Sequence, residues 1–169
     1  GTSLIITARN GVWKVNGGTD SVFSATNYLV EKITSHGSQG PESVVKVDHS
    51  VMYWGDDGIY AVSPNQYGEW QSTNISSGTI QTLYDNISSE SKITAKGLFG
   101  SFELKVRWIY NQDVNDSSET KELIFDVSLK AFYTNTIKNF DGTGLPRVVS
   151  VFEVSPFQLV TNQFNVING

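Results

Sequence analysis

The sequence contains no cysteine, one methionine and few charged residues, which make up 17% of its 169 positions. Without cysteine, a disulfide scaffold, a thiol nucleophile and a cysteine-based zinc site are excluded. No apolar run approaches the roughly 18 to 20 residues that a membrane-spanning helix needs. The net charge of −5, with lysines and arginines scattered singly, argues against binding through phosphate neutralisation. We therefore expect neither a membrane partner nor a sequence-specific nucleic-acid partner.

Uncharged polar residues are abundant in the sequence. Ser, Thr and Asn occupy 47 of the 169 positions, and 12% of the residues are aromatic. Threonine, β-branched aliphatic and aromatic residues favour strands, whereas Asn, Ser and Gly favour the turns between strands. The composition thus predicts an all-β fold.

An internal repeat organises the first half of the chain. Residues 4–15 and 51–62 align without a gap at an offset of 47, and each copy reads as an apolar run, a turn and a second apolar run. Asn10 with Gly11, and Asp57 with Gly58, are predicted to be the structural turn residues of two hairpins. These dipeptides favour the type I′ turn, in which both central residues have positive φ.

Two looser units follow. Residues 104–110 alternate between apolar and other side chains, as in a strand with one apolar face, and an apolar run follows at 123–127. Residues 131–137 mirror residues 69–75 at an offset of 62, and a further unit is predicted to begin at Arg147. The approximate units are residues 1–42, 43–90, 91–140 and, in part, 141–169.

The repeat length matches the blades of β-propellers, which are small antiparallel sheets of about 40 to 50 residues. A chain of 169 residues holds about 3.6 units of 47 residues, whereas closed propellers usually need roughly 4 to 8 blades. We expect a partial β-propeller of three to four blades, belonging to a longer chain. A β-sandwich is the alternative.

One segment has helical periodicity. Ile80, Leu83, Tyr84 and Ile87 recur at the spacing of one helix face, after serines and a glycine that suit a helix start. A short helix is predicted over residues 79–87, covering a sheet edge or filling a gap between units.

Large aromatic residues occupy strand positions within the repeat. Each would bury roughly 150 to 250 Å² between sheets, so they are predicted to form the core more readily than a platform for sugars. These structural core residues are Trp13, Trp54, Trp70, Trp108 and Phe132.

Catalytic and metal-binding patterns are missing. His36 and His49 have no second ligand at metal spacing, and no nucleophile elbow, P-loop or dinucleotide fingerprint occurs. Asp56 and Asp57 lie beside aromatic residues, as glycosidase carboxylates can, but an Asp-Gly turn explains them without catalysis. The sequence predicts no catalytic residue, no metal and no cofactor; a glycosidase is the weakest alternative.

A family resemblance is carried by five segments in order. They are residues 43–62, the helical residues 79–87, and residues 95–99, 105–111 and 125–134. Together they resemble the propeller region of tail nozzle proteins of short-tailed bacteriophages, also called tail tubular or stabilisation proteins. The first hairpin is similar to the preceding blade of that family.

The resemblance implies a structural virion component that acts by packing and not by catalysis. Copies of the chain, six in that family, would surround the tail axis and contact other tail proteins such as an adaptor or a fibre. Read without the resemblance, the residues also allow a carbohydrate-binding propeller or adhesin, which would expose tryptophans near Asp or Asn side chains.

Overall fold

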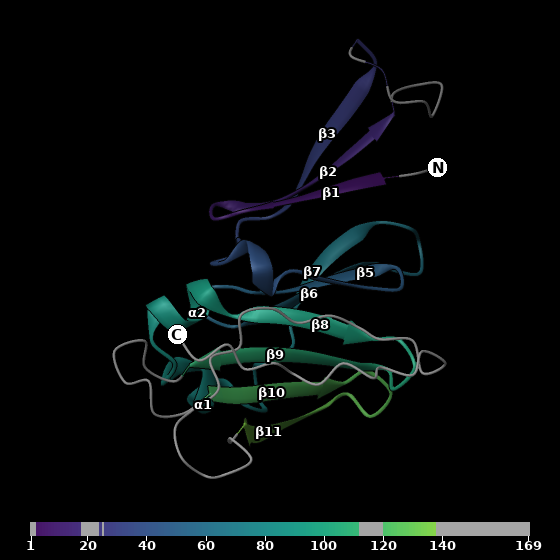
Figure 1. Cartoon of the computed structure of the whole chain (residues 1–169). Helices are drawn as coiled ribbons and strands as arrows, with labels where there is room; N and C mark the ends of the chain where they lie inside the picture. The colour runs from purple at the N-terminus through teal and green to yellow at the C-terminus, as the bar shows by residue number, and fades with distance from the viewer. Residues whose placement is uncertain (1–2, 18–23, 25, 112–119, 138–169) are drawn as a thin grey trace, which may run out of the picture.

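Three antiparallel sheets lie face to face in the computed structural model, which describes residues 3–17, 24, 26–111 and 120–137 (Figure 1). The first sheet consists of β1 (Ser3–Ala8), β2 (Gly11–Gly17) and β3 (Tyr28–Thr34). The second consists of β4 (Val45–Val47), β5 (Ser50–Trp54), β6 (Ile59–Pro64) and β7 (Trp70–Asn74). The third consists of β8 (Lys96–Gly100), β9 (Lys105–Asn111), β10 (Thr120–Asp126) and β11 (Ala131–Ile137).

Each sheet is a meander, since strands that follow one another along the chain are hydrogen-bonded neighbours. A short 3-10 helix, η1 (Pro41–Ser43), precedes the second sheet. The helices α1 (Gln81–Asp85) and α2 (Ser89–Thr94) connect the second sheet to the third and lie at one end of both (Figure 1). Within the described residues, no helix has the length and apolar character needed to cross a bilayer.

The cross-strand register confirms the 47-residue repeat. The hairpin β1–β2 and the hairpin β5–β6 pair residues that are equivalent at this offset, so the same positions face each other in both. The equivalent pairs are Leu4–Val15 with Val51–Val62, Ile6–Trp13 with Tyr53–Tyr60, and Thr7–Val12 with Trp54–Ile59. A one-residue slip in either hairpin would turn every apolar side chain to the opposite face.

The second sheet is covered on both faces. Successive side chains of a strand point to opposite faces, and Tyr53 and Trp54 are both fully buried. Tyr53 belongs to an apolar cluster shared with the first sheet, and Trp54 belongs to the larger cluster shared with the third sheet. The core of the molecule is therefore two apolar layers, one on each side of this sheet.

The larger layer is built around Trp54 and Trp108. Their ring centroids are 6.2 Å apart, and Tyr84 from α1 meets Trp54 edge-on at 5.3 Å. The Trp108 indole Nε1 donates a hydrogen bond of 2.9 Å to the carbonyl of Ser43, which ties the third sheet to the segment before the second. Apolar packing and a directional bond thus act on the same ring.

The helix predicted over residues 79–87 is shorter than expected and is followed by a second one. The helix α1 covers only Gln81–Asp85, although Ile80, Leu83, Tyr84 and Ile87 do pack against the larger core cluster. The chain then restarts as α2, because the Ser88 side chain accepts a hydrogen bond from the Ser91 N–H and caps the new helix.

The predicted type I′ turns are wrong, although both hairpins exist. Asn10, Asp57 and Gly58 do not have positive φ, and of the four predicted turn residues only Gly11 does, at 150°. Arg9 and Asn10 form the loop between β1 and β2, whose last pair is Ala8 with Gly11. The loop between β5 and β6 spans four residues and is closed by the Gly55 N–H, which donates to the Gly58 carbonyl at 2.8 Å.

The mostly β fold is confirmed, but closure of the sheets into a propeller is not detected in the residues that the structure describes. Three stacked sheets also differ from the two of a β-sandwich. In the third sheet, Leu104 lies outside β9 with φ of 55°, whereas it was predicted to begin the strand. The loop at 112–119 and the unit from Arg147 lie outside the described residues.

Gly58 provides a test of the hairpin loop. A Cβ atom at this position would lie 2.4 Å from Asn74 Nδ2 and 2.8 Å from Ser76 Oγ. Asn74 cannot yield easily, because its Oδ1 accepts hydrogen bonds from the N–H groups of Ser76 and Ser77 and from the Ser76 hydroxyl. We expect Gly58→Ala to lower the free energy of unfolding by roughly 1 to 3 kcal/mol, measured by urea denaturation.

The matched control is Gly100→Ala, where the nearest atom to a new Cβ is the Lys105 carbonyl oxygen at 3.7 Å. This variant should unfold at nearly the parental urea concentration. Equal stability of both variants would show that the loop packs differently.

Candidate functional site

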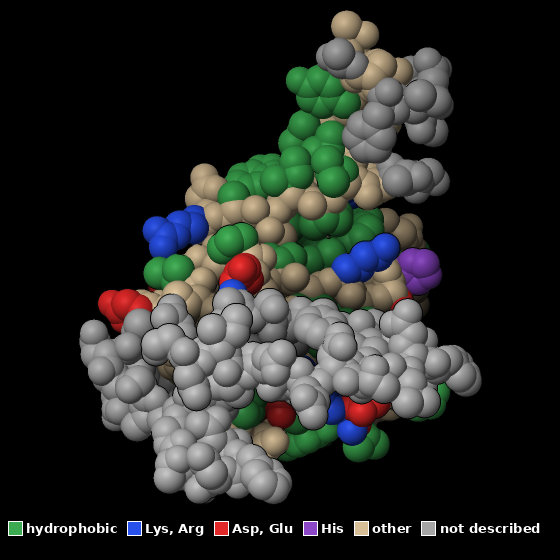
Figure 2. Space-filling view, in the orientation of Figure 1, with side chains coloured by type: hydrophobic (Ala, Val, Ile, Leu, Met, Phe, Trp, Pro, Cys, Tyr) green, Lys and Arg blue, Asp and Glu red, His purple; other side chains and the backbone are tan. Residues whose placement is uncertain are grey.

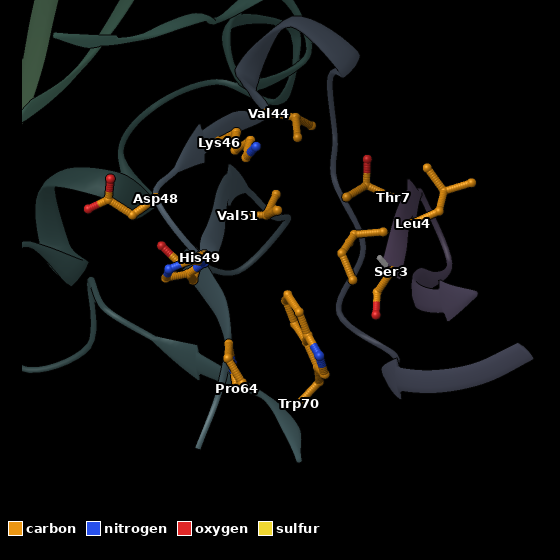
Figure 3. A pocket seen from close by; sticks show the side chains of 12 residues that line it. Ser3, Leu4, Thr7, Val44, Lys46, Asp48, His49, Val51, Pro64 and Trp70 are labelled. Carbon is orange, nitrogen blue, oxygen red and sulfur yellow. The ribbon is translucent and has the colours of Figure 1, made fainter. Parts of the chain in front are cut away.

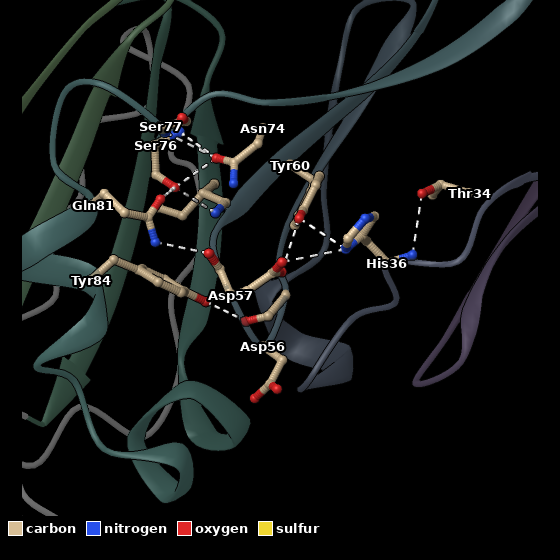
Figure 4. A network of polar contacts seen from close by, with 12 residues as sticks. Thr34, His36, Asp56, Asp57, Tyr60, Asn74, Ser76, Ser77, Gln81 and Tyr84 are labelled. Carbon is tan, nitrogen blue, oxygen red and sulfur yellow. Dashed lines mark hydrogen bonds and ion pairs between the residues drawn. The ribbon is translucent and has the colours of Figure 1, made fainter.

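A polar network surrounds the loop between β5 and β6, which contains the acidic residues Asp56 and Asp57 (Figure 4). The Tyr60 hydroxyl donates to Asp57 Oδ1 at 2.9 Å and lies 3.0 Å from His36 Nδ1. If the phenol proton goes to Asp57, the imidazole must donate to the phenol oxygen, so His36 carries a proton on Nδ1. The His36 ring also stacks on Tyr60, with ring centroids 4.9 Å apart. The network joins the segment after the first sheet to the second sheet.

The two adjacent aspartates do not form a facing pair. The carboxylate of Asp57 points toward Tyr60 and His36, whereas the carboxylate of Asp56 points away from these two side chains (Figure 4). The backbone carbonyls of both residues are also used, Asp56 by Lys92 Nζ at 3.0 Å and Asp57 by Gln81 Nε2 at 2.8 Å. This geometry fits a loop held in place by its neighbours, and it lacks the opposed carboxyls that glycoside hydrolysis needs.

The tyrosines of this region are built to remain protonated. Burial raises the pKa of Tyr53 to about 12, and burial together with Asp57 raises the pKa of Tyr60 above its ordinary value. Burial also raises the pKa of Tyr84, and the nearby carboxylates add to that shift. Each phenol donates a hydrogen bond: Tyr53 to the His36 carbonyl at 2.7 Å and Tyr84 to the Gly55 carbonyl at 2.5 Å. They donate hydrogen bonds and resist losing their protons.

The predicted aromatic residues fall into two groups. Trp54 and Trp108 are fully buried between the second and third sheets, and Phe132 is partly buried against the same cluster, with its ring 4.7 Å from that of Phe125. Trp13 and Trp70 are only partly buried. Trp13 lies on the first sheet under the ammonium group of Lys32, and Trp70 packs against the smaller cluster.

The first sheet has one face that nothing covers in the described part of the chain. Its other face meets the second sheet through residues such as Ile5 and Val12. Residues that alternate with these along the strands therefore point outward. Four large side chains on this outward face are strongly exposed: Leu4 by 54%, Ile6 by 43%, Tyr28 by 58% and Val30 by 52%. With Trp13 and Val15 they form the outer face, which is seen as the green surface at the top of Figure 2.

The repeat shows what kind of partner this outer face suits. At the 47-residue offset, its positions on β1 and β2 correspond to positions on the second sheet that the first sheet covers. The equivalents of Ile6, Trp13 and Val15 are Tyr53, Tyr60 and Val62, exposed by 0%, 5% and 0%. Ile6 is thus exposed, and Trp13 and Val15 are partly buried, at positions that are fully covered one repeat later.

The opposite end of the stack carries a charged pair. On β9 and β10, the side chains that point away from the second sheet include Arg107 and Glu122, joined by a hydrogen bond of 2.9 Å between Nη1 and Oε1. Arg107 also pairs with Glu103. Ile109 and Ile124 share this face, and Glu122 and Ile124 are buried on it, so the two ends of the described stack differ in charge and in exposure.

A groove of about 580 Å³ opens between the first two sheets (Figure 3). Of the first sheet, only β1 lines it among the described residues, and the opposite wall comes from the second sheet. The lining residues are Ser3, Leu4, Ile5, Thr7, Val44, Lys46, Asp48, His49, Ser50, Val51, Pro64 and Trp70. The wall is mainly apolar beside Trp70 and polar near the Asp48–His49 turn.

Sequence reasoning missed both the outer face and the groove. The apolar residues of β1 and β2 were recognised as strand residues, but alternation alone does not tell which face a neighbouring sheet covers. The exposed β3 residues could have given the signal, because Tyr28, Leu29 and Val30 are three large apolar residues in succession.

No cluster of three or more potential metal ligands occurs among the residues that the structure describes. Comparison with models of known protein families and with curated protein sequences found no match.

The buried phenols predict how stability depends on pH. A group whose pKa is raised by folding binds its proton more tightly in the folded state, so its contribution is complete below the unfolded pKa of about 10 and is lost above it. We expect the free energy of unfolding to fall above pH 10, by about 1.4 kcal/mol per pH unit for each such tyrosine.

Urea denaturation between pH 8 and pH 12 measures this dependence. Tyr53→Phe should reduce the slope above pH 10, whereas Tyr28→Phe, at an exposed phenol on the outer face, serves as the control. A parental curve that stays flat up to pH 12 would contradict the buried, protonated state of these side chains.

Proposed function

We propose that the chain is a structural assembly module that works by stacking β-sheets against other β-sheets. The outer face of the first sheet carries this proposal, because it exposes Leu4, Ile6, Tyr28 and Val30, and because the equivalents of Ile6, Trp13 and Val15 one repeat later are buried. Soluble proteins rarely leave contiguous apolar patches of this kind without a partner. The low fraction of charged residues is consistent with this, since the cores of interfaces are depleted in charge.

The finer proposal is a tail nozzle component of a short-tailed bacteriophage. It rests on the order of the five segments that resemble that family, together with three successive antiparallel sheets of the kind a propeller sector contains. In this role the chain is a non-catalytic virion protein, present in six copies around the tail axis and in contact with adaptor or fibre proteins. A carbohydrate-binding module is the alternative, and the groove lined by Trp70 and Asp48 is the place where it would bind a sugar.

Charge placed on the outer face tests the assembly role. Sedimentation velocity of the parental chain at increasing concentration should show species larger than the monomer. The double variant Tyr28→Glu, Val30→Glu should stay monomeric at the same concentrations, because association would bury two unpaired carboxylates. Both residues are more than half exposed, so folding should be kept.

The matched control adds the same charge elsewhere. Phe102 and Leu129 are exposed by 78% and 75% and lie outside the outer face. The double variant Phe102→Glu, Leu129→Glu should associate as the parental chain does. Association that survives the first pair of substitutions, or is abolished by the second, would contradict the assignment.

The location has its own test. Antibodies against the chain should label the tail ends of intact short-tailed particles from the source culture in electron micrographs. If such particles carry no label on their tails while the chain is detected elsewhere, the phage assignment is wrong, and the assembly role of the outer face stands on the sedimentation result.

A further inference from the structure

Among the strands that the structure describes, the first sheet has one fewer than the other two. The second and third sheets have four strands each, whereas the first has three. The repeat identifies the strand that is lacking: β1 is equivalent to β5, and β5 pairs with β6 on one side and β4 on the other. In the described residues β1 has a neighbour on one side only. Its second edge therefore presents backbone N–H and C=O groups that no strand pairs with.

The residues of β1 itself carry no charge that would protect this edge. Charged side chains commonly prevent an edge strand from pairing with another chain. The other edge of the same sheet, β3, carries Glu31 and Lys32, but β1 has the sequence SLIITA and contains no charge. Of the two edges, β1 is the one suited to accept a further strand.

The groove lies where the side chains of that strand would go. It is bounded by β1 and by the second-sheet wall of Val44, Val51 and Trp70 (Figure 3). The corresponding strand of the second sheet, β4, shows the effect of filling such a space, because Val45 and Val47 are only 5% and 2% exposed between their sheet and the next. The volume of about 580 Å³ can receive several aliphatic side chains.

We propose that the free edge of β1 and this groove bind an extended segment of a partner polypeptide, which pairs antiparallel with β1 as a fourth strand. Main-chain hydrogen bonds supply part of the affinity, and alternate side chains enter the groove and supply the specificity. The segment carries aliphatic residues at these alternate positions, to match Ile5, Val44 and Val51. Charges of both signs, Lys46 and Asp48, lie at the polar end of the groove, so no net charge is required of the segment.

The inference goes beyond the proposed function and uses a different surface. The outer face contacts another sheet through side chains, whereas the β1 edge pairs through the backbone on the strand's free side. The Glu substitutions at Tyr28 and Val30, neither of which lines the groove, test the first surface. The experiment below tests the second, so either proposal can fail alone.

The chain supplies its own probe. A capped synthetic peptide with the sequence of residues 43–49, SVVKVDH, contains β4, the strand that occupies the equivalent position beside β5. Titrated into the full chain, the peptide should change the fluorescence of the tryptophans, with Trp70 in the groove. At saturation, amide hydrogen exchange in β1 should slow by roughly tenfold or more, while exchange in β3, the other edge of the sheet, should not change.

The backbone requirement has a matched control. The same peptide, N-methylated at alternate residues on its pairing edge, keeps every side chain but cannot form the ladder. It should neither bind nor slow exchange in β1. Equal binding of both peptides would show that the groove takes side chains without strand addition, and would overturn the proposal.

Two further outcomes would also overturn it. One is unchanged exchange in β1 at millimolar peptide with the chain still folded. The other concerns the chain without peptide: amide hydrogen exchange in β1 is already slow, and it becomes fast in the double variant Val149→Pro, Val151→Pro. That result would show that residues 147–154, which the sequence predicts to begin a further unit, already fill the edge, so the strand would come from this chain and not from a partner.

Discussion

The second sheet is apolar on both faces, and this constraint determines the rest of the structure. Tyr53 and Trp54 are neighbours on one strand and point to opposite faces, so neither face can be left exposed to water, and a sheet must lie on each side. The first and third sheets provide these covers. Burying one such aromatic side chain removes on the order of 150 to 250 Å² from water, which explains why the described chain is a stack of sheets with helices only at one end.

Apolar burial alone does not set the orientation of three sheets, because it has no direction. Aromatic side chains that donate to backbone carbonyls supply the direction. Trp108 bonds to Ser43, Tyr84 to Gly55 and Tyr53 to His36, and each bond joins segments that lie far apart in sequence. Trp54 is the contrast, since its buried Nε1 has no hydrogen-bond partner. Its contribution is packing, whereas that of Trp108 is packing and position.

The repeat was predictable because strand register depends on the alternation of apolar side chains with a period of two, and this alternation is visible in the sequence. Leu4 and Val51, or Val15 and Val62, keep their pairing whatever lies around them. The loop conformations were not predictable in this way. Asp57 and Gly58 suit a type I′ turn in isolation, but the Gly55–Gly58 hydrogen bond and the packing of Asn74 and Ser76 against Gly58 favour a longer loop. Tertiary contacts override the local preference there, whereas the second helix begins at a local cap, the hydrogen bond from the Ser91 N–H to the Ser88 side chain.

The two ends of the stack limit how copies of the chain can meet. If the outer face of one copy packed on the far face of another copy's third sheet, Arg107, whose side chain keeps 29% of its exposure beside the buried Glu122, would lose its remaining water against Leu4 and Val30. Desolvating such a pair costs several kcal/mol per ion unless new hydrogen bonds replace the lost water. Copies are therefore more stable with their first sheets together, or with the first sheet under an unlike apolar sheet.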